Sequence, residues 1–390
     1  MRSVVPPGAW LGLLGGGQLG RMFCMAAQSL GYKVAVLDPG ADSPAGSVAD
    51  RHLRADYLDP AALAELGALA RAATTEFENV PAGALDYLAR TARVTPAAAS
   101  VAIAQDRISE KTFLAGHGFA VTRFAVLRSD ADARDVDPAL VPGIVKSARF
   151  GYDGKGQVRV AGTADVAAAF REMSGQPCVL EALVALACEV SVIVARNERG
   201  ETATWPVAEN RHRDSILDVT IVPARVTDAL AGQARAIATA VATKLDYRGV
   251  LCVEMFVSTA GELLVNEIAP RPHNSGHYTI DACVTSQFEQ QARVLADLPL
   301  GATRQHEPAV MLNLLGDIWF ASPAARSPRE PDWTCVLRHP QAKLHIYGKA
   351  VPRRGRKMGH VTCLALTIDE ALATARAIKR DLGIPGADTL

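Results

Sequence analysis

Short apolar runs alternate with longer amphipathic stretches over the first hundred residues of the chain. This pattern predicts strands at 10–14 and 33–37, helices at 21–30 and 60–70, and an apolar run at 74–80. Alternation of strand and helix is typical of βαβ units around a parallel sheet. The chain is therefore expected to begin with an α/β domain.

The pattern changes after residue 97. A helix is expected at 97–115 and a strand at 119–127, followed by a linker rich in Asp, Pro and Ala at 130–142. Further on, the pattern predicts a strand at 144–147, helices at 164–173 and 228–245, and paired strands at 250–257 and 263–268. We expect three domains, at 1–104, 105–300 with a lid at about 128–184, and 301–390.

Composition excludes several classes of protein. The 390 residues are 49% hydrophobic, and 41 Lys and Arg balance 41 Asp and Glu. A neutral chain lacks the basic excess of a general nucleic-acid binder, and no apolar run approaches the about 18 residues of a membrane span. The seven cysteines are scattered, without a CxxC pair, so they are expected to be reduced and mostly buried. A start without signal-peptide character predicts a cytoplasmic protein.

A glycine loop follows the first predicted strand. Gly15, Gly17 and Gly20 form G-x-G-x-x-G before a helix, and Asp38 ends the next strand. This context is typical of a dinucleotide site, because glycines let the backbone approach a phosphate. An NAD-dependent enzyme, a tight turn without ligand and a different phosphate ligand all remain open. Glu76 and Glu78 follow at the end of another predicted parallel strand, where ligands of such sheets collect.

A second glycine-rich segment lies at 149–157, after Lys146. Backbone N–H groups of such a loop can surround nucleotide phosphates, although its spacing is not that of a P-loop. A plain hairpin turn is the alternative.

Glu254 and Glu267 carry the strongest physical signal. If Ser258 pairs with Leu263 in a hairpin, the two glutamates face each other across the ladder, with Cβ atoms about 5 Å apart. Two carboxylates among apolar neighbours repel each other unless a divalent cation binds them, and magnesium prefers such oxygens. The alternative is that one glutamate turns outward or is protonated.

These features together resemble the ATP-grasp ligases. Four further segments resemble the members of that family that carboxylate 5-aminoimidazole ribonucleotide: GGQLGRM at 16–22, EFEN at 76–79, APRPHNSGH at 269–277 and GRKMGH at 355–360. The resemblance runs from about residue 10 to about residue 360. It implies an α/β protein with an ATP-grasp fold, an N-terminal Rossmann-like parallel-sheet domain and a small C-terminal domain.

The resemblance also implies a set of site residues. ATP would be surrounded by Arg107, Lys146, Gly151, Tyr152, Asp153, Gly154, Lys155, Gly156, Gln157, Glu181, Ala182, Leu183, Val184, Glu189, His212, Asn266 and Glu267. Magnesium, two ions in number, would be held by Glu254 and Glu267. The ribonucleotide would contact Gln18, Leu19, Glu76, Tyr152, Arg271, His273, Asn274, Ser275, Lys349, Arg356 and Lys357. Arg271, His273, Lys146 and Asp153 would act in catalysis.

The implied reaction joins bicarbonate to the amine of 5-aminoimidazole ribonucleotide and converts ATP to ADP and phosphate. An arginine fork suits planar bicarbonate, and the basic run from Lys349 to Lys357 suits the ribonucleotide's phosphate. A solvated hairpin and an RNA patch are the alternatives for that run. A formate-using ATP-grasp ligase, a non-catalytic nucleotide sensor and an NAD-dependent dehydrogenase are the alternatives for the whole chain. A homodimer is expected from the resemblance, with no nucleic-acid or membrane partner.

Overall fold

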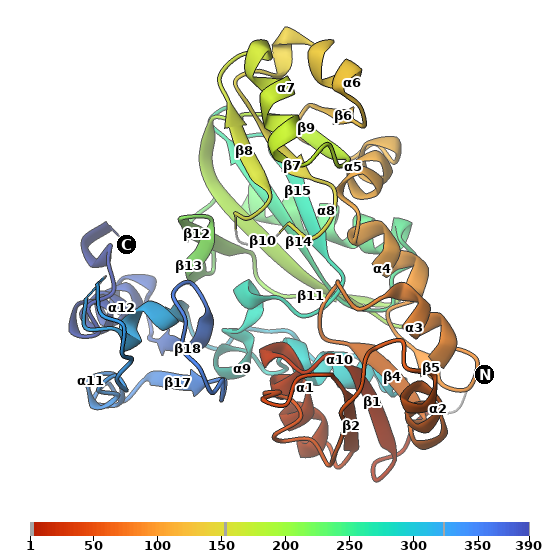
Figure 1. Cartoon of the computed structure of the whole chain (residues 1–390). Coiled ribbons are helices and arrows are strands. Elements are labelled where there is room, and N and C mark those ends of the chain that lie inside the picture. Colours follow the sequence, from red (N-terminus) through yellow and green to blue (C-terminus); the bar gives the residue numbers. More distant parts are fainter. Residues whose placement is uncertain (1–3, 152–153, 323, 390) are drawn as a thin grey trace.

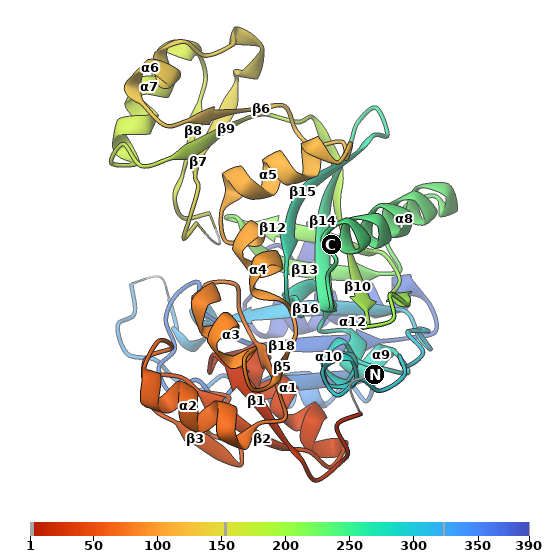
Figure 2. The same ribbon diagram turned by 90° about the vertical axis from the view of Figure 1, so that its right-hand side faces the viewer.

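Three β-sheets organise the chain, which is seen from two sides in Figures 1 and 2. The computed structural model describes residues 4–151, 154–322 and 324–389. The N-terminal sheet lies at the bottom of Figure 1, a four-stranded sheet lies at the top, and a nine-stranded sheet lies between them and extends into the tail. No helix in these described stretches is long and apolar enough to cross a membrane.

The N-terminal sheet is parallel, with strand order β3-β2-β1-β4-β5. Its strands are β1 (Trp10–Leu14), β2 (Lys33–Leu37), β3 (Arg51–Leu53), β4 (Ala72–Thr75) and β5 (Arg93–Val94). The helices α1 (Gln18–Ser29), α2 (Pro60–Leu69) and α3 (Ala82–Leu88) follow β1, β3 and β4. The predicted strands at 10–14 and 33–37 are confirmed, because their runs of buried apolar residues suit a sheet covered on both faces.

Three local predictions at this end of the chain were wrong. Helix α1 begins at Gln18, three residues before the expected start. Strand β4 ends at Thr75, so residues 76–80 form a loop rather than an apolar strand. The helix expected at 97–115 is broken into α4 (Ala98–Ala104) and α5 (Arg107–Gly116), because the carboxylate of Asp106 accepts the backbone N–H of Ser109 and starts a new helix.

The four-stranded sheet has the order β6-β9-β7-β8 and carries two short helices on one side (Figure 1). Its strands are β6 (Phe124–Leu127), β7 (Gly143–Ser147), β8 (Gln157–Val160) and β9 (Cys178–Ala182), with helices α6 (Asp130–Arg134) and α7 (Thr163–Glu172). A strand was expected at 119–127, but β6 covers only the last four of these residues. The expected linker at 130–142 contains α6, capped by Ser129, and a 3₁₀ turn at Pro138–Leu140.

The nine-stranded sheet is antiparallel, in the order β15-β14-β10-β12-β13-β16-β18-β17, with β11 beside β10. Its strands are β10 (Leu186–Arg196), β11 (Thr202–Thr204), β12 (Ala208–Arg213), β13 (Ile216–Val222), β14 (Gly249–Ser258), β15 (Leu263–Ala269), β16 (Ala309–Leu315), β17 (Ala342–Ile346) and β18 (Lys357–Leu364). Because β13 pairs with β16, the tail extends the central sheet rather than forming a sheet of its own.

Helices pack on both faces of this long sheet. Helix α8 (Asp228–Lys244) covers β10 and β14, and α12 (Ile368–Asp381) packs on β16 and β18. Helix α10 (Gln287–Leu295) packs against α1 and so joins the central part to the N-terminal sheet. The remaining short elements are 3₁₀ turns at Asn274–Gly276, Gly316–Trp319 and Ala387–Thr389 and the helices α9 (Thr279–Ala282) and α11 (Thr334–Leu337). The site described next lies where these three sheets approach one another.

Candidate active site

Two carboxylates face each other on neighbouring strands of the central sheet. Glu254 on β14 is directly opposite Glu267 on β15, which confirms the predicted pairing of these two residues. The ladder begins one residue out of the expected register, with Val257 opposite Leu263, and a bulge after Glu254 restores the pairing. Asn266 is the extra residue of that bulge. Its buried Oδ1 has no hydrogen-bond partner among the described residues.

The surroundings of these carboxylates suit a cation. Burial and the neighbouring charge of Glu267 raise the pKa of Glu254. Arg107 Nη1 lies 3.5 Å from Glu267 Oε2, and His273 Nε2 lies 3.2 Å from Glu254 Oε1. The two carboxylates supply oxygen donors, which fit a hard divalent ion such as magnesium, and the unpartnered amide oxygen of Asn266 belongs to the residue next to Glu267.

A buried ion cluster connects α5 with the four-stranded sheet. Glu181 Oε2 on β9 lies 3.0 Å from Lys146 Nζ on β7 and 3.5 Å from Lys111 Nζ. Burial opposes ionisation of Glu181, but the two lysines outweigh it, and the pKa of Glu181 is lowered. Burial also lowers the pKa of Lys111, which is fully enclosed.

Sequence reasoning missed Lys111 and its neighbour Glu110. Glu110 Oε1 accepts the backbone N–H of Ile268 at 2.6 Å, and burial raises the pKa of Glu110 to about 7. Spacing along the helix is the signal that could have found them, because Arg107, Glu110 and Lys111 lie at i, i+3 and i+4 and share one face. That face is turned toward Glu267 and Glu181.

The other residues expected near ATP lie around these groups. Glu189 on β10 lies 2.8 Å from His212 Nδ1 on β12; burial opposes protonation of this histidine, but Glu189 raises its pKa. Ala182 ends β9, and Leu183 and Val184 link it to β10. In the glycine-rich loop, Gly151, Gly154, Lys155 and Gly156 precede Gln157, whose Nε2 donates to Ser215 Oγ at 3.2 Å. Tyr152 and Asp153 lie outside the described residues.

Arg271 and His273 lie beside the carboxylate pair. Arg271 Nε donates to Glu78 Oε2, so the loop after β4 reaches the central sheet. Burial opposes ionisation of Glu78, but Arg271 outweighs it and lowers the pKa of Glu78. Burial and the charge of Arg271 hold the pKa of His273 well below its ordinary value. Asn274 is buried, and neither polar atom of its side chain has a partner among the described residues.

The glycine loop holds an anion from the chain itself. Gly17 N donates to Glu76 Oε1 at 2.5 Å, and Gly20 N donates to Glu76 Oε2 at 2.9 Å. Burial raises the pKa of Glu76, while these two hydrogen bonds lower it in part. The carboxylate therefore lies where a dinucleotide fingerprint would bind phosphate. Leu19 lies between the two donating residues on the first turn of α1.

The tail brings its basic run to the same end of α1. Lys349 Nζ donates to Gln18 Oε1, and it also donates to Lys357 O at 2.6 Å. Arg356 Nη1 donates to Val351 O at 2.6 Å within the loop between β17 and β18. The structure thus brings Gln18 together with Lys349, which is 331 positions away in the sequence.

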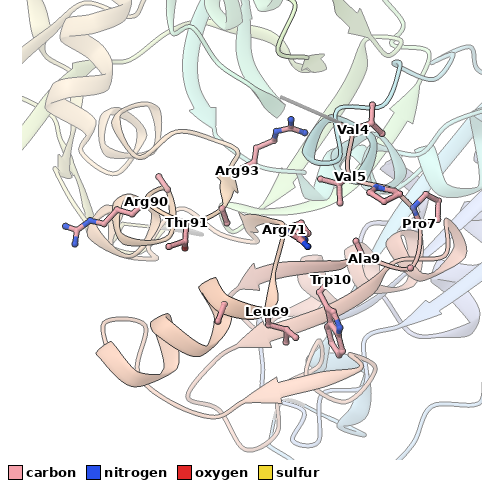
Figure 3. A pocket seen from close by; sticks show the side chains of 15 residues that line it. Val4, Val5, Pro7, Ala9, Trp10, Leu69, Arg71, Arg90, Thr91 and Arg93 are labelled. Atoms are coloured by element: carbon pink, nitrogen blue, oxygen red, sulfur yellow. The ribbon is translucent and has the colours of Figure 1, made fainter. Parts of the chain in front are cut away.

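A wide surface hollow lies away from these residues, at the amino end of the N-terminal strands (Figure 3). Its volume is about 1120 Å³, and its wall includes Trp10, Leu69, Arg71, Arg90 and Arg93. The C-terminal ends of α2 and α3 point toward it, and such ends do not attract anions. None of the predicted site residues lines this hollow.

Comparison with known proteins agrees with this arrangement. Three family profiles match the chain: the ribonucleotide synthetase preATP-grasp domain over 9–105, the ATP-grasp domain over 112–288, and the phosphoribosylaminoimidazole carboxylase C-terminal domain over 309–374. An N5-carboxyaminoimidazole ribonucleotide synthase of Brucella melitensis is 46% identical over 364 residues, which cover 93% of this chain and 98% of the relative. The chain belongs to the N5-carboxyaminoimidazole ribonucleotide synthase family. This membership excludes an NAD-dependent dehydrogenase, which the glycine loop alone had left open.

Further relatives extend the match over nearly the whole chain. The Bacillus subtilis N5-carboxyaminoimidazole ribonucleotide synthase is 41% identical and covers 98% of this chain and 99% of its own. A solved ADP complex of an N5-carboxyaminoimidazole ribonucleotide synthetase has a TM-score of 0.89 at 40% identity, covering 97% and 98% of the two chains. The Aspergillus clavatus enzyme with ADP and 5-aminoimidazole ribonucleotide has a TM-score of 0.87 at 31% identity, covering 96% and 99%. The ATP-grasp fold expected from the sequence is confirmed.

Proposed function

We propose that this chain carboxylates 5-aminoimidazole ribonucleotide with bicarbonate, at the cost of ATP, in purine biosynthesis. A bicarbonate oxygen attacks the γ-phosphorus of ATP, and ADP leaves. The resulting carboxyphosphate has a good leaving group, so the substrate amine can attack its carbon, directly or after CO₂ is released within the site. Phosphate departs, the amine loses a proton, and N5-carboxyaminoimidazole ribonucleotide is formed.

The opposed pair of Glu254 and Glu267 is the observation that carries this proposal. These glutamates would hold magnesium, two ions in the ATP-bound protein, because carboxylate oxygens suit a hard divalent cation. When bound, magnesium supplies neutralisation of charge on the β- and γ-phosphates. Arg107 lies close enough to Glu267 to orient that carboxylate from the other side.

ATP would lie between the four-stranded and the central sheets. Lys146 would hold phosphate oxygens, and Glu181, which also pairs with Lys111, fixes its position. The glycine-rich loop, with Gly151, Asp153 and Lys155, would cover the phosphates. Residues 182–184, Glu189 and His212 would surround the nucleoside.

Bicarbonate and the ribonucleotide would meet beside the carboxylates. The guanidinium of Arg271, held by Glu78, would bind bicarbonate through paired hydrogen bonds. His273 would position reacting groups next to Glu254. Lys349, Arg356 and Lys357 would bind the 5′-phosphate of the ribonucleotide, with Gln18 and Leu19 at the edge of that pocket. Asn274, whose amide has no partner among the described residues, would contact the same substrate.

Phosphate release provides the test. Release should require ATP together with both bicarbonate and 5-aminoimidazole ribonucleotide, and formate should not replace bicarbonate. Formate-dependent release would favour the alternative ATP-grasp ligase, and ATP binding without any turnover would favour a nucleotide sensor. Family resemblance also supports a cytoplasmic homodimer, and sedimentation equilibrium would measure the oligomeric state.

A further inference from the structure

A chain of hydrogen bonds leads from Glu254 into the core of the central sheet. His273 Nε2 lies 3.2 Å from Glu254 Oε1, and His273 Nδ1 lies 2.9 Å from Ser275 Oγ. Ser275 Oγ is 2.8 Å from Ser191 Oγ on β10. Asn210 Nδ2 on β12 donates to Ser191 Oγ at 2.8 Å, and Thr220 Oγ1 on β13 donates to Asn210 Oδ1 at 3.1 Å.

One backbone group fixes the direction of the protons along this chain. The backbone N–H of Ser275 donates to His273 Nδ1 at 3.3 Å, so Nδ1 is an acceptor and carries no proton. The proton of the neutral imidazole is then on Nε2, which faces Glu254. Each hydroxyl can donate one step toward His273: Ser191 to Ser275, and Ser275 to Nδ1. With this assignment, Ser191 Oγ and Ser275 Oγ each accept one hydrogen bond and donate one along the chain.

The chain is sealed from solvent. Exposure is 0% for Ser275, 1% for Ser191, 4% for Asn210 and 0% for Thr220. Buried hydroxyl and amide groups cost stability unless they are paired, so apolar side chains would serve the sheet better if packing alone mattered. Ser275 Oγ is also already bonded on two sides, which leaves it poorly placed for the substrate contact that sequence reasoning expected.

We propose that Ser275, Ser191 and Asn210 are positioning residues that hold His273 as an Nε2–H donor and thereby orient the carboxylate of Glu254 for the metal. This inference rests on the proposed function, in which Glu254 is a magnesium ligand. Side chains that hydrogen-bond to a metal ligand hold the ligand's oxygen in the orientation that binds the ion. Ser191, Asn210 and Thr220 lie on β10, β12 and β13, which are consecutive neighbours in the sheet, and Ser275 lies on the 3₁₀ turn at Asn274–Gly276.

Ser275→Ala in the full chain tests the proposal. The magnesium concentration that gives half-maximal ADP formation should rise about tenfold, while the KM for 5-aminoimidazole ribonucleotide changes less than about twofold. Ser191→Ala should act in the same direction, and the double variant should be no worse than Ser275→Ala alone, because both act through one chain. Thr362→Val is the matched control, since it removes a buried hydroxyl of the same sheet that has no partner among the described residues.

A second measurement does not depend on activity. In metal-free protein, ¹⁵N NMR of labelled histidine should show His273 with a protonated Nε2 and a bare Nδ1, assigned by comparison with His273→Asn. Ser275→Ala removes the hydroxyl donor and keeps the backbone N–H, so it should shift the Nδ1 resonance while the proton stays on Nε2, and Thr362→Val should shift neither nitrogen. If Ser275→Ala fails to fold, Ser191→Ala carries the same two readouts.

Other outcomes overturn the inference in distinguishable ways. A raised ribonucleotide KM with an unchanged magnesium requirement would make Ser275 a substrate contact instead. A wild-type His273 with its proton on Nδ1 would reject the direction of the chain. Wild-type protein that forms no ADP would count against the proposed function, and the NMR result would still decide the state of His273.

Discussion

The backbone N–H of Gly17 donates a hydrogen bond of 2.5 Å to Oε1 of Glu76, so the first turn of α1 binds a carboxylate from the loop after β4. A helix N-terminus favours an anion because its N–H groups are unpaired and its dipole is positive there. A Cβ atom at position 17 would clash with Glu76 Oε1, so a larger residue there would displace this carboxylate. The glycine loop thus makes room for the chain's own acidic side chain.

Glu76→Ala should destabilise the N-terminal sheet. The change leaves two N–H groups, of Gly17 and Gly20, without their acceptor and removes a charge from the helix end, at a cost of about 2–4 kcal/mol. Thermal unfolding and hydrogen exchange of α1 would measure the loss. Glu76→Gln keeps the volume and one acceptor, so it should cost less than Glu76→Ala; a Glu76→Gln variant as stable as wild type would argue against a role of the charge.

Glu267→Gln should lower ADP formation by at least about a hundredfold, because it keeps the side chain's shape and removes the charge that magnesium needs. ADP release at saturating ATP, bicarbonate and ribonucleotide would measure the effect, with circular dichroism to verify the fold. Glu262→Gln, on the exposed turn of the same hairpin, is the control and should behave as wild type. Near-normal turnover at ordinary magnesium concentrations would remove Glu267 from the metal site.

Arg356→Met should weaken binding of the ribonucleotide alone. A charge-assisted contact with phosphate contributes about 1.5–3 kcal/mol, so the KM for 5-aminoimidazole ribonucleotide should rise roughly tenfold to a hundredfold while that for ATP stays nearly constant. Arg354→Met on the same loop is the control, since Arg354 instead donates to Ser322 O at 2.9 Å and packs over Phe320. Steady-state kinetics with each substrate varied would reveal a nucleotide role if the KM for ATP changed instead.

Glu110 should make the metal-free protein less stable as the pH rises. Its pKa is about 7 in the folded protein against 4.5 when exposed, so between these values the unfolded chain releases a proton that the folded chain keeps. Ionisation of Glu110 therefore lowers the free energy of unfolding by about 3 kcal/mol. This loss is absent below pH 4.5 and complete above pH 7. Glu110→Gln should gain stability relative to wild type as the pH rises from 5 to 8.

Thermal unfolding of the metal-free protein at both pH values would measure this gain. Glu172→Gln, at an exposed carboxyl of α7, should show no such gain. A constant difference between Glu110→Gln and wild type across this range would contradict a raised pKa.

Strands whose signal is local could be predicted from the sequence. The runs at 10–14 and 33–37 are apolar at nearly every position, and the structure keeps both boundaries. Glu254 and Glu267 could be paired because turn length and residue spacing limit the register of a hairpin. The bulge at Asn266 could not be foreseen, since one extra residue on β15 changes the ladder without changing the composition.

Contacts between distant segments could not be predicted in the same way. The partner of Lys111 is on β9, and that of Gly17 is on the loop after β4, so each depends on how whole elements pack. The helix break at Asp106 was missed because the apolar pattern continues across it, whereas a single capping hydrogen bond decides it. Sequence patterns thus identified many of the charged site residues. They did not identify the partners with which the fold pairs these residues.

The pairing of β13 with β16 makes the tail inseparable from the rest of the chain. A version shortened before Ala309 would lose three strands and leave the edge of β13 with a row of unpaired N–H and C=O groups. Such an edge recruits strands from other molecules, so the shortened protein should aggregate rather than survive as a smaller ATPase. Truncated or fused versions of this protein must therefore keep the chain from Ile216 to Leu364 uninterrupted.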